Sequence, residues 1–166
     1  MSQMSRRMFG LLAVVVLVSL VGCKGMGGGD KPAEQAAATK SLYDRLGGDP
    51  AITAVVDDFV NRAAADPKVN FTRKGTPAEW NASAENVAKL KKHLTLFVEM
   101  VTGGPQKYEG KDMKTVHAGM AITNDEFNAI ATDLAATLDK FKVPEAEKTE
   151  LLTIVASTRG DIVEKK

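Results

Sequence analysis

From residue 41 onward, hydrophobic side chains recur at intervals of three and four residues, which places them on one face of an α-helix. The pattern predicts a short helix at 41–47, longer helices at 50–65, 87–101, 124–141 and from 144 onward, and a short helical segment at 113–118. No stretch alternates hydrophobic and polar residues as a half-buried strand would. The polar residues 72–85 predict one long loop. We therefore expect a small all-α domain.

Residues at the expected helix ends support this assignment. Asp49-Pro50 supplies a capping side chain followed by a proline in the first turn. Thr123 and Glu126 have the spacing of a capping box, in which each side chain binds the other residue's backbone N–H. Gly103-Gly104-Pro105 is a typical sequence for the end of a helix.

The first 22 residues have the layout of an export signal. Arg6 and Arg7 precede a hydrophobic run, residues 11–21, that is too short to cross a bilayer comfortably. Leu20-Val21-Gly22-Cys23 resembles the bacterial lipobox, whose cysteine becomes the lipidated first residue of the mature protein. We therefore expect a lipoprotein signal peptide at 1–22, a flexible tether at 23–40 that is rich in glycine and alanine, and a folded domain at 41–166.

This signal predicts a location in the bacterial cell envelope, with the protein anchored by lipid on the periplasmic or outer face of a membrane. Lipidation at Cys23 would supply more than one acyl chain, which stable anchoring requires. The alternative is an N-terminal helix that stays uncleaved and serves as the anchor.

Charge and cysteine content exclude several classes of partner and site. The formal net charge is +1, and without Arg6 and Arg7 the 22 basic residues become 20, against 21 acidic residues. A nucleic-acid-binding protein would carry a basic stripe, so we expect no nucleic-acid partner. Because Cys23 is the single cysteine, the chain has no intramolecular disulfide and no site built from several cysteines.

The chain contains two histidines, and both lie in hydrophobic surroundings. His93 borders the apolar stripe of the 87–101 helix, and His117 lies between apolar residues of the short 113–118 segment. Haem iron needs one imidazole and accepts a second on its opposite face. Periodicity alone does not distinguish such ligands from histidines buried for packing. No Cys-x-x-Cys-His sequence is present, so covalent attachment of the cytochrome c kind is not expected.

Several sequence motifs together resemble the truncated haemoglobins, group I in particular, over roughly residues 41–164. The motifs are Ser41-Leu42-Tyr43-Asp44-Arg45-Leu46-Gly47-Gly48, Asp58-Phe59, Thr102-Gly103-Gly104-Pro105 with Tyr108 and Gly110, Met113-Lys114-Thr115-Val116-His117, Ala121-Ile122-Thr123-Asn124-Asp125-Glu126-Phe127, and Leu134-Ala135-Ala136-Thr137 ahead of Val143-Pro144. The resemblance implies a truncated globin fold, a two-over-two helical sandwich that holds one haem b (iron protoporphyrin IX).

The resemblance also implies roles for individual residues. His117 corresponds to the proximal iron ligand, and His93 falls where some members place a second, distal histidine ligand. Lys91 and Lys92 are candidates to pair with the haem propionates. The residues expected to wall the haem are Phe59, Val60, Phe71, Leu90, Leu94, Phe97, Tyr108, Met113, Val116, Met120, Ile122 and Phe127.

The chain departs from the family on the distal side of the haem. Many group I members have a tyrosine where this chain has Val60, and often glutamine where it has Leu90 and Leu94. A hydrogen bond to bound oxygen in a dry pocket contributes about 1–3 kcal/mol. We therefore expect fast oxygen release and autoxidation unless His93 supplies the donor. The 72–85 loop is longer than is usual, and we expect Trp80 to pack over the edge of the pocket.

These observations predict a haem globin that reversibly binds a diatomic gas, namely oxygen, nitric oxide or carbon monoxide. The principal alternative is an envelope redox or electron-transfer haem protein with an unidentified redox partner, or one that detoxifies nitric oxide or peroxide. That alternative would make the chain a weak oxidoreductase rather than a carrier. A third alternative is an interaction protein that has kept the fold and lost the haem.

Overall fold

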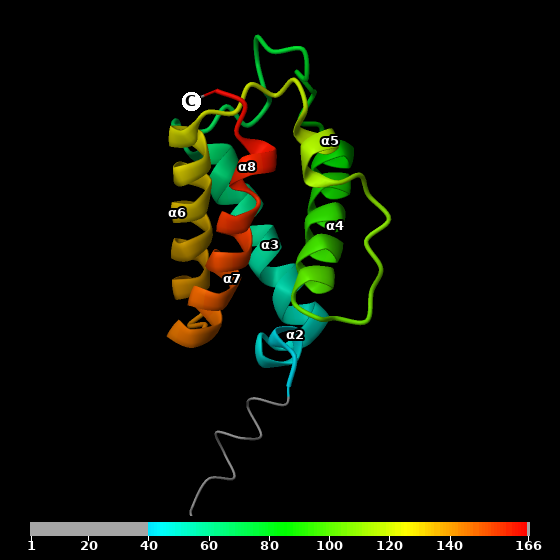
Figure 1. Cartoon of the computed structure of the whole chain (residues 1–166), viewed down its shortest axis with the longest axis vertical. Helices are drawn as coiled ribbons and strands as arrows, with labels where there is room; N and C mark the ends of the chain where they lie inside the picture. Colours follow the sequence, from blue (N-terminus) through cyan, green and yellow to red (C-terminus); the bar gives the residue numbers. More distant parts are fainter. Residues whose placement is uncertain (1–39, 166) are drawn as a thin grey trace, which may run out of the picture. The chain divides into compact units, whose positions relative to one another are not determined.

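The computed structural model describes residues 40–165, so the predicted signal peptide at 1–22 and all but the end of the tether at 23–40 lie outside the described residues. The helices are α2 (Leu42–Arg45), α3 (Gly48–Ala65), α4 (Ala84–Val101), α5 (Met113–His117), α6 (Asn124–Lys140), α7 (Glu145–Ser157) and α8 (Arg159–Ile162) (Figure 1). Within residues 40–165 the only β pairing is an isolated bridge between Thr123 and Lys165, which confirms the all-α prediction. None of the helices in this range is long and apolar enough to cross a membrane.

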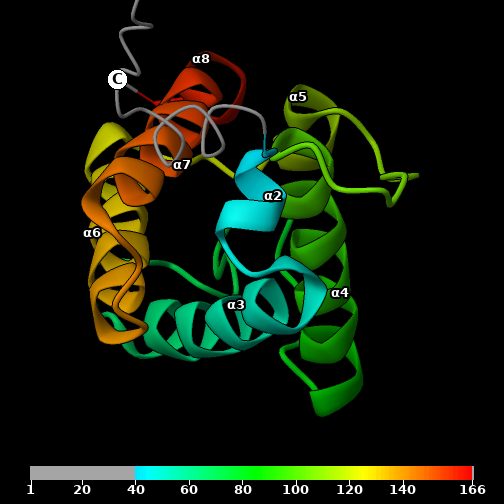
Figure 2. The same cartoon turned by 90° about the horizontal axis from the view of Figure 1, so that it is seen from below.

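Helix α3 is central to the packing, because it contacts both α4 and α6, and α6 in turn packs against α7. Figure 2 shows α6 and α7 on one side of the domain and α4 with α5 on the other. The core therefore has two parts. Ile52, Val56 and Val60 of α3 pack toward α4, whereas Leu134 and Leu138 of α6 pack with residues of α2 and α7.

Some helix ends agree with the sequence signals and others differ. The predicted Asp49 cap is wrong, since α3 already begins at Gly48 and no side chain caps it. The capping box at α6 is confirmed, since Thr123 Oγ1 accepts from Glu126 N at 3.1 Å and Thr123 N donates to Glu126 Oε2 at 3.0 Å. Helix α4 begins at Ala84, earlier than predicted, because the Ser83 hydroxyl caps it by accepting from Asn86 N. The prediction of one continuous helix after residue 144 is wrong, because this segment is divided into α7 and α8 at Thr158.

The join between α2 and the end of α4 requires a glycine. Tyr43 N donates to Thr102 O at 2.8 Å, which brings the Tyr43 ring against the chain that leaves α4. A Cβ at Gly104 would lie 2.7 Å from that ring and 2.9 Å from Glu99 O. Gly104 therefore allows a close approach as well as ending the helix.

Glu99, in the last turn of α4, is fully buried, although a glutamate is usually exposed to solvent. Neither carboxyl oxygen has a hydrogen-bond partner among the described residues. Burial, together with the neighbouring Asp49 carboxyl, raises the pKa of Glu99. The folded state therefore favours the protonated acid, and stability decreases as the pH rises from about 4.5 through the folded-state pKa.

We expect Glu99→Gln to raise the melting temperature of the domain at pH 8, because the neutral amide avoids the cost of ionising a buried carboxyl. The gain should shrink as the pH falls toward 4, where the parent acid is protonated in both states. Glu85→Gln is the control, since Glu85 lies exposed in the first turn of the same helix and should give no such gain. Thermal unfolding monitored by circular dichroism checks this, and a gain from Glu99→Gln that is the same at every pH would contradict it.

Candidate functional site

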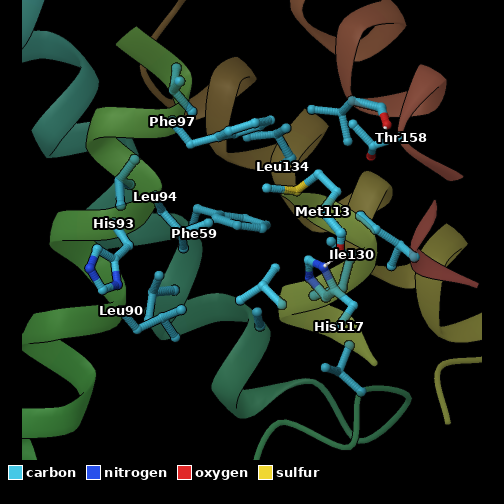
Figure 3. Close-up of a pocket in the computed structure, with 18 of the residues that line it drawn as sticks. Phe59, Leu90, His93, Leu94, Phe97, Met113, His117, Ile130, Leu134 and Thr158 are labelled. Carbon is cyan, nitrogen blue, oxygen red and sulfur yellow. Dashed lines mark hydrogen bonds between the residues drawn. The ribbon is translucent and has the colours of Figure 1, made fainter. Parts of the chain in front are cut away.

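An apolar cavity of about 720 Å³ lies between α3 and α4 on one side and α5, α6 and α7 on the other (Figure 3). This volume is in the range of sites that hold an organic cofactor. Apart from the two lysines, Lys91 and Lys92, all the residues expected to contact haem or iron line it: Phe59, Val60, Phe71, Leu90, His93, Leu94, Phe97, Tyr108, Met113, Val116, His117, Met120, Ile122 and Phe127. Residues distant in sequence are thus brought together around one space.

His117 is the last residue of α5, and the structure determines which of its ring nitrogens is free. His117 Nδ1 lies 2.7 Å from the carbonyl oxygen of Met113, one helical turn earlier. A carbonyl only accepts, so Nδ1 carries the proton and donates, and Nε2 keeps its lone pair. An imidazole oriented in this way is the form that binds a metal.

Burial also keeps His117 in its neutral form. Desolvation lowers the pKa of the His117 imidazole, the nearby positive charge of Arg73 lowers it further, and the bond to Met113 O and the Glu164 carboxylate oppose the shift. The usual pKa of histidine is about 6.5, so the lowered value leaves the ring unprotonated at neutral pH. A neutral ring is required of a metal ligand.

His93 lies on α4, on the other side of the cavity from His117 (Figure 3). It is exposed, and it makes no hydrogen bond to another residue of the described range. It therefore borders both the cavity and solvent, as its position at the edge of the apolar stripe predicts.

The lysines are arranged differently from the prediction. Lys92 is exposed and does not line the cavity, and Lys91 pairs with Asp57, with 3.2 Å between Nζ and Oδ1. Lys89 lines the cavity instead, and its ammonium lies 2.7 Å from the Glu85 carboxylate. The signal that could have identified Lys89 is its spacing, since residues four apart on a helix share a face and Lys89 lies four before His93.

Trp80 lines the cavity, as expected, and packs against Phe71. Their ring centroids are 5.3 Å apart, and the Trp80 indole N–H donates to Phe71 O at 2.8 Å. Several other residues line the cavity without having been predicted to do so, among them Arg73, Ile130, Leu134, Val155 and Thr158. Ile130 and Leu134 belong to the apolar face of α6, so the periodicity marks them as buried without indicating which space they border.

The polar side chains around the cavity are almost all bonded within the protein. Side chains that make such a bond are Asn70, Arg73, Trp80, Asn86, Lys89, Tyr108, Glu126, Thr158 and, through Nδ1 alone, His117. The Tyr108 hydroxyl, for example, donates to Lys111 O at 3.1 Å while its ring packs edge-on against Phe97. His117 Nε2 and the His93 ring are therefore the polar groups among these lining residues that remain to receive a cofactor or ligand.

Comparison with known proteins agrees with this geometry. A family model described as bacterial-like globin matches residues 41–164. The chain is 34% identical over 126 residues to the group 1 truncated hemoglobin of Tetrahymena pyriformis, covering 76% of this chain and 97% of the relative. It is also 34% identical to the group 1 truncated hemoglobin GlbN of Mycolicibacterium paratuberculosis, covering 76% and 86%.

Solved structures show the same architecture. The Tetrahymena pyriformis truncated hemoglobin in its Fe(III) form superposes with a TM-score of 0.65 at 34% identity, covering 76% of this chain and 100% of that one. The 2/2 hemoglobin of a Synechococcus species, in the cyanomet state with covalently attached heme, gives 0.66 at 30% identity with the same coverage. The predicted two-over-two sandwich is thus confirmed, and the chain belongs to the bacterial-like globin family, with group 1 truncated haemoglobins among its relatives.

Proposed function

We propose that this chain is a haem b globin that reversibly binds a diatomic gas, with His117 as the proximal ligand of the iron. The observation that carries this proposal is the hydrogen bond from His117 Nδ1 to Met113 O, which leaves Nε2 available in an apolar cavity. Family membership supports it, since relatives and structural neighbours are truncated haemoglobins.

The cavity fits the cofactor. A porphyrin is a large, flat and mostly apolar molecule, and the cavity has about 720 Å³ of space with a mainly apolar lining. Residues of α3 and α4 would contact one face, namely Phe59, Leu90, Leu94 and Phe97, and residues around α5 and the start of α6 the other, namely Met113, Val116, Met120, Ile122 and Phe127. Haem b supplies an iron that takes an imidazole on one face and leaves the other for a gas molecule or a second histidine.

The side chains around the site have distinct roles. Met113 O orients the His117 ring and increases the basicity of Nε2. The apolar walls would bind the porphyrin by burying its apolar surface. Val60, Leu90 and Leu94 offer no hydrogen-bond donor, and Asn86 and Lys89 of α4 are bonded to Asn81 and Glu85. His93 would then be the residue of α4 that can donate to, or compete with, a gas ligand.

Replacing the two histidines one at a time tests these assignments. His117→Ala should abolish stable haem uptake, because it removes the proximal ligand. His93→Ala should retain haem, and if the parent spectrum is low-spin it should become high-spin. Titration of the purified protein with haemin, followed by visible absorption of the reduced and oxidised forms, measures both.

The outcome is informative in each direction. A His117→Ala protein that holds haem as tightly as the parent would overturn the proposed function. A parent that is already high-spin, or a His93→Ala spectrum identical to a low-spin parent, would remove His93 from the ligands.

The lack of a donor at Val60, Leu90 and Leu94 predicts weak discrimination in favour of oxygen. Leu94→Gln places an amide donor in the cavity and should slow oxygen dissociation by roughly tenfold or more, since a hydrogen bond in a dry site contributes 1–3 kcal/mol. Carbon monoxide carries less charge when bound and should be affected less. Leu94→Met is the matched control, since it keeps size and apolar character. Flash photolysis of both gases measures the rates, and equal effects of glutamine and methionine would contradict the prediction.

We further propose that the protein is a lipoprotein of the bacterial envelope, anchored through Cys23. The lipobox-like sequence at residues 20–23 supports this, although it lies outside the described residues. Expressed in a bacterium, the full chain should partition into detergent and take up labelled palmitate, and Cys23→Ser should be unlabelled and released from membranes. If both forms remain in the membrane unlabelled, the uncleaved anchor helix is correct, and if both are soluble, neither anchor exists.

A further inference from the structure

The loop between α3 and α4, residues 66–83, closes one end of the cavity. Phe71 and Trp80 present their packed rings to the cavity, and Trp80 N also donates to Thr72 O at 3.1 Å. This loop is therefore a structured wall, held together by its own hydrogen bonds.

Arg73, in the middle of this loop, is buried, with 6% of its surface exposed. Its guanidinium reaches three separate places in the fold. Nε donates to Asn70 O within the loop at 2.5 Å, Nη1 donates to Met120 O at 3.2 Å, and Nη2 donates to Glu126 Oε1 at 2.6 Å. Only the planar fork of an arginine can make these three bonds at once.

Glu126 completes the link from its side. Burial alone would raise the pKa of Glu126, but the hydrogen bonds from Arg73 and from the backbone N–H groups of Thr123 and Asn70 outweigh it and lower the pKa. The carboxylate is thus charged and bonded both to the loop and to the start of α6. The buried Arg73–Glu126 ion pair is stabilised by the further hydrogen bonds that each of its two side chains makes.

The segment that Arg73 contacts is the turn that directly follows His117. Met120, whose carbonyl accepts from Arg73, also donates its N–H to His117 O at 3.1 Å. On the opposite side the Glu164 carboxylate accepts from Gly119 N at 2.8 Å and from Ala121 N at 2.5 Å. Gly119 and Ala121 both have positive φ, so the turn has a tight conformation that these contacts hold in place.

We propose that Arg73 is a positioning residue for His117: by joining the 66–83 loop to the turn after His117, it determines how firmly the histidine holds the haem. This inference rests on the proposed haem-globin function and adds to it. Through Arg73, the 66–83 loop and the proximal ligand His117 are coupled. Opening of the loop therefore weakens the binding of haem.

The test compares Arg73→Lys with Arg45→Lys in the haem-loaded chain. Lysine keeps the charge of Arg73 but cannot reach its three acceptors together. Arg45 is the matched control, because its guanidinium also joins separate elements through charged hydrogen bonds. It links α2 to Glu147 and Glu150 of α7 and does not line the cavity. Far-UV circular dichroism of both variants shows whether the helices are retained.

We expect Arg73→Lys to lose haem to an excess of apomyoglobin roughly tenfold faster than the parent. Loss of one charge-assisted hydrogen bond changes a dissociation rate by about this factor. Its iron–histidine stretching band, measured by resonance Raman spectroscopy of the reduced form, should shift. In the haem-free protein the fluorescence of Trp80, the single tryptophan, should move to longer wavelength. Arg45→Lys should leave all three signals at parent values.

The outcomes separate this inference from the function on which it rests. A parent chain that takes up no haemin overturns both together. A parent that binds haem while Arg73→Lys keeps the parent's haem-loss rate and Raman band overturns the positioning role alone. Equal changes in Arg73→Lys and Arg45→Lys also overturn it, because they would show a general loss of stability.

Discussion

The hydrogen bond from His117 Nδ1 to the carbonyl oxygen of Met113 is the interaction on which the site depends. It fixes the tautomer and the direction of the ring, and it exists only while α5 keeps its helical turn. A helix of five residues is not stable on its own in water, because the free energy that nucleation costs exceeds what so few hydrogen bonds contribute. Its stability comes from contacts around it, including the Asp112 cap, which accepts from Thr115 N at 2.9 Å, and from the ties that Arg73 and Glu164 make to the following turn.

The cavity combines an apolar interior with a surrounding layer of satisfied polar groups. Burying the Arg73–Glu126 pair costs desolvation, and the pair is tolerated because its charged atoms are hydrogen-bonded. The same layer leaves the interior without spare donors other than histidine. A flat apolar cofactor and a small uncharged gas are the ligands that such a space accommodates at least cost.

Membership of the globin family accounts for the scaffold and leaves the choice of ligand to local residues. The helices that carry Phe59 and His117 are arranged as in the truncated haemoglobins of known structure. In the proposed function, Val60, Leu90 and Leu94 would weaken the preference for oxygen, because their side chains offer no hydrogen-bond donor to a bound gas. The fold would then position the iron, and these three apolar residues would adjust which gas it holds.

Most of the helices, the α6 capping box and the apolar surroundings of His117 could be predicted from local sequence, because each depends on residues within one or two turns of one another. Three features could be learned from the folded chain alone: the burial of Arg73 and Glu99, the place of Lys89 rather than Lys92 beside the cavity, and the break of the last helix at Thr158. These outcomes depend on segments far apart in the chain. Arg73 stands in a polar loop that looks solvent-exposed, and it is buried only because Met120 and Glu126, about fifty residues later, provide its acceptors.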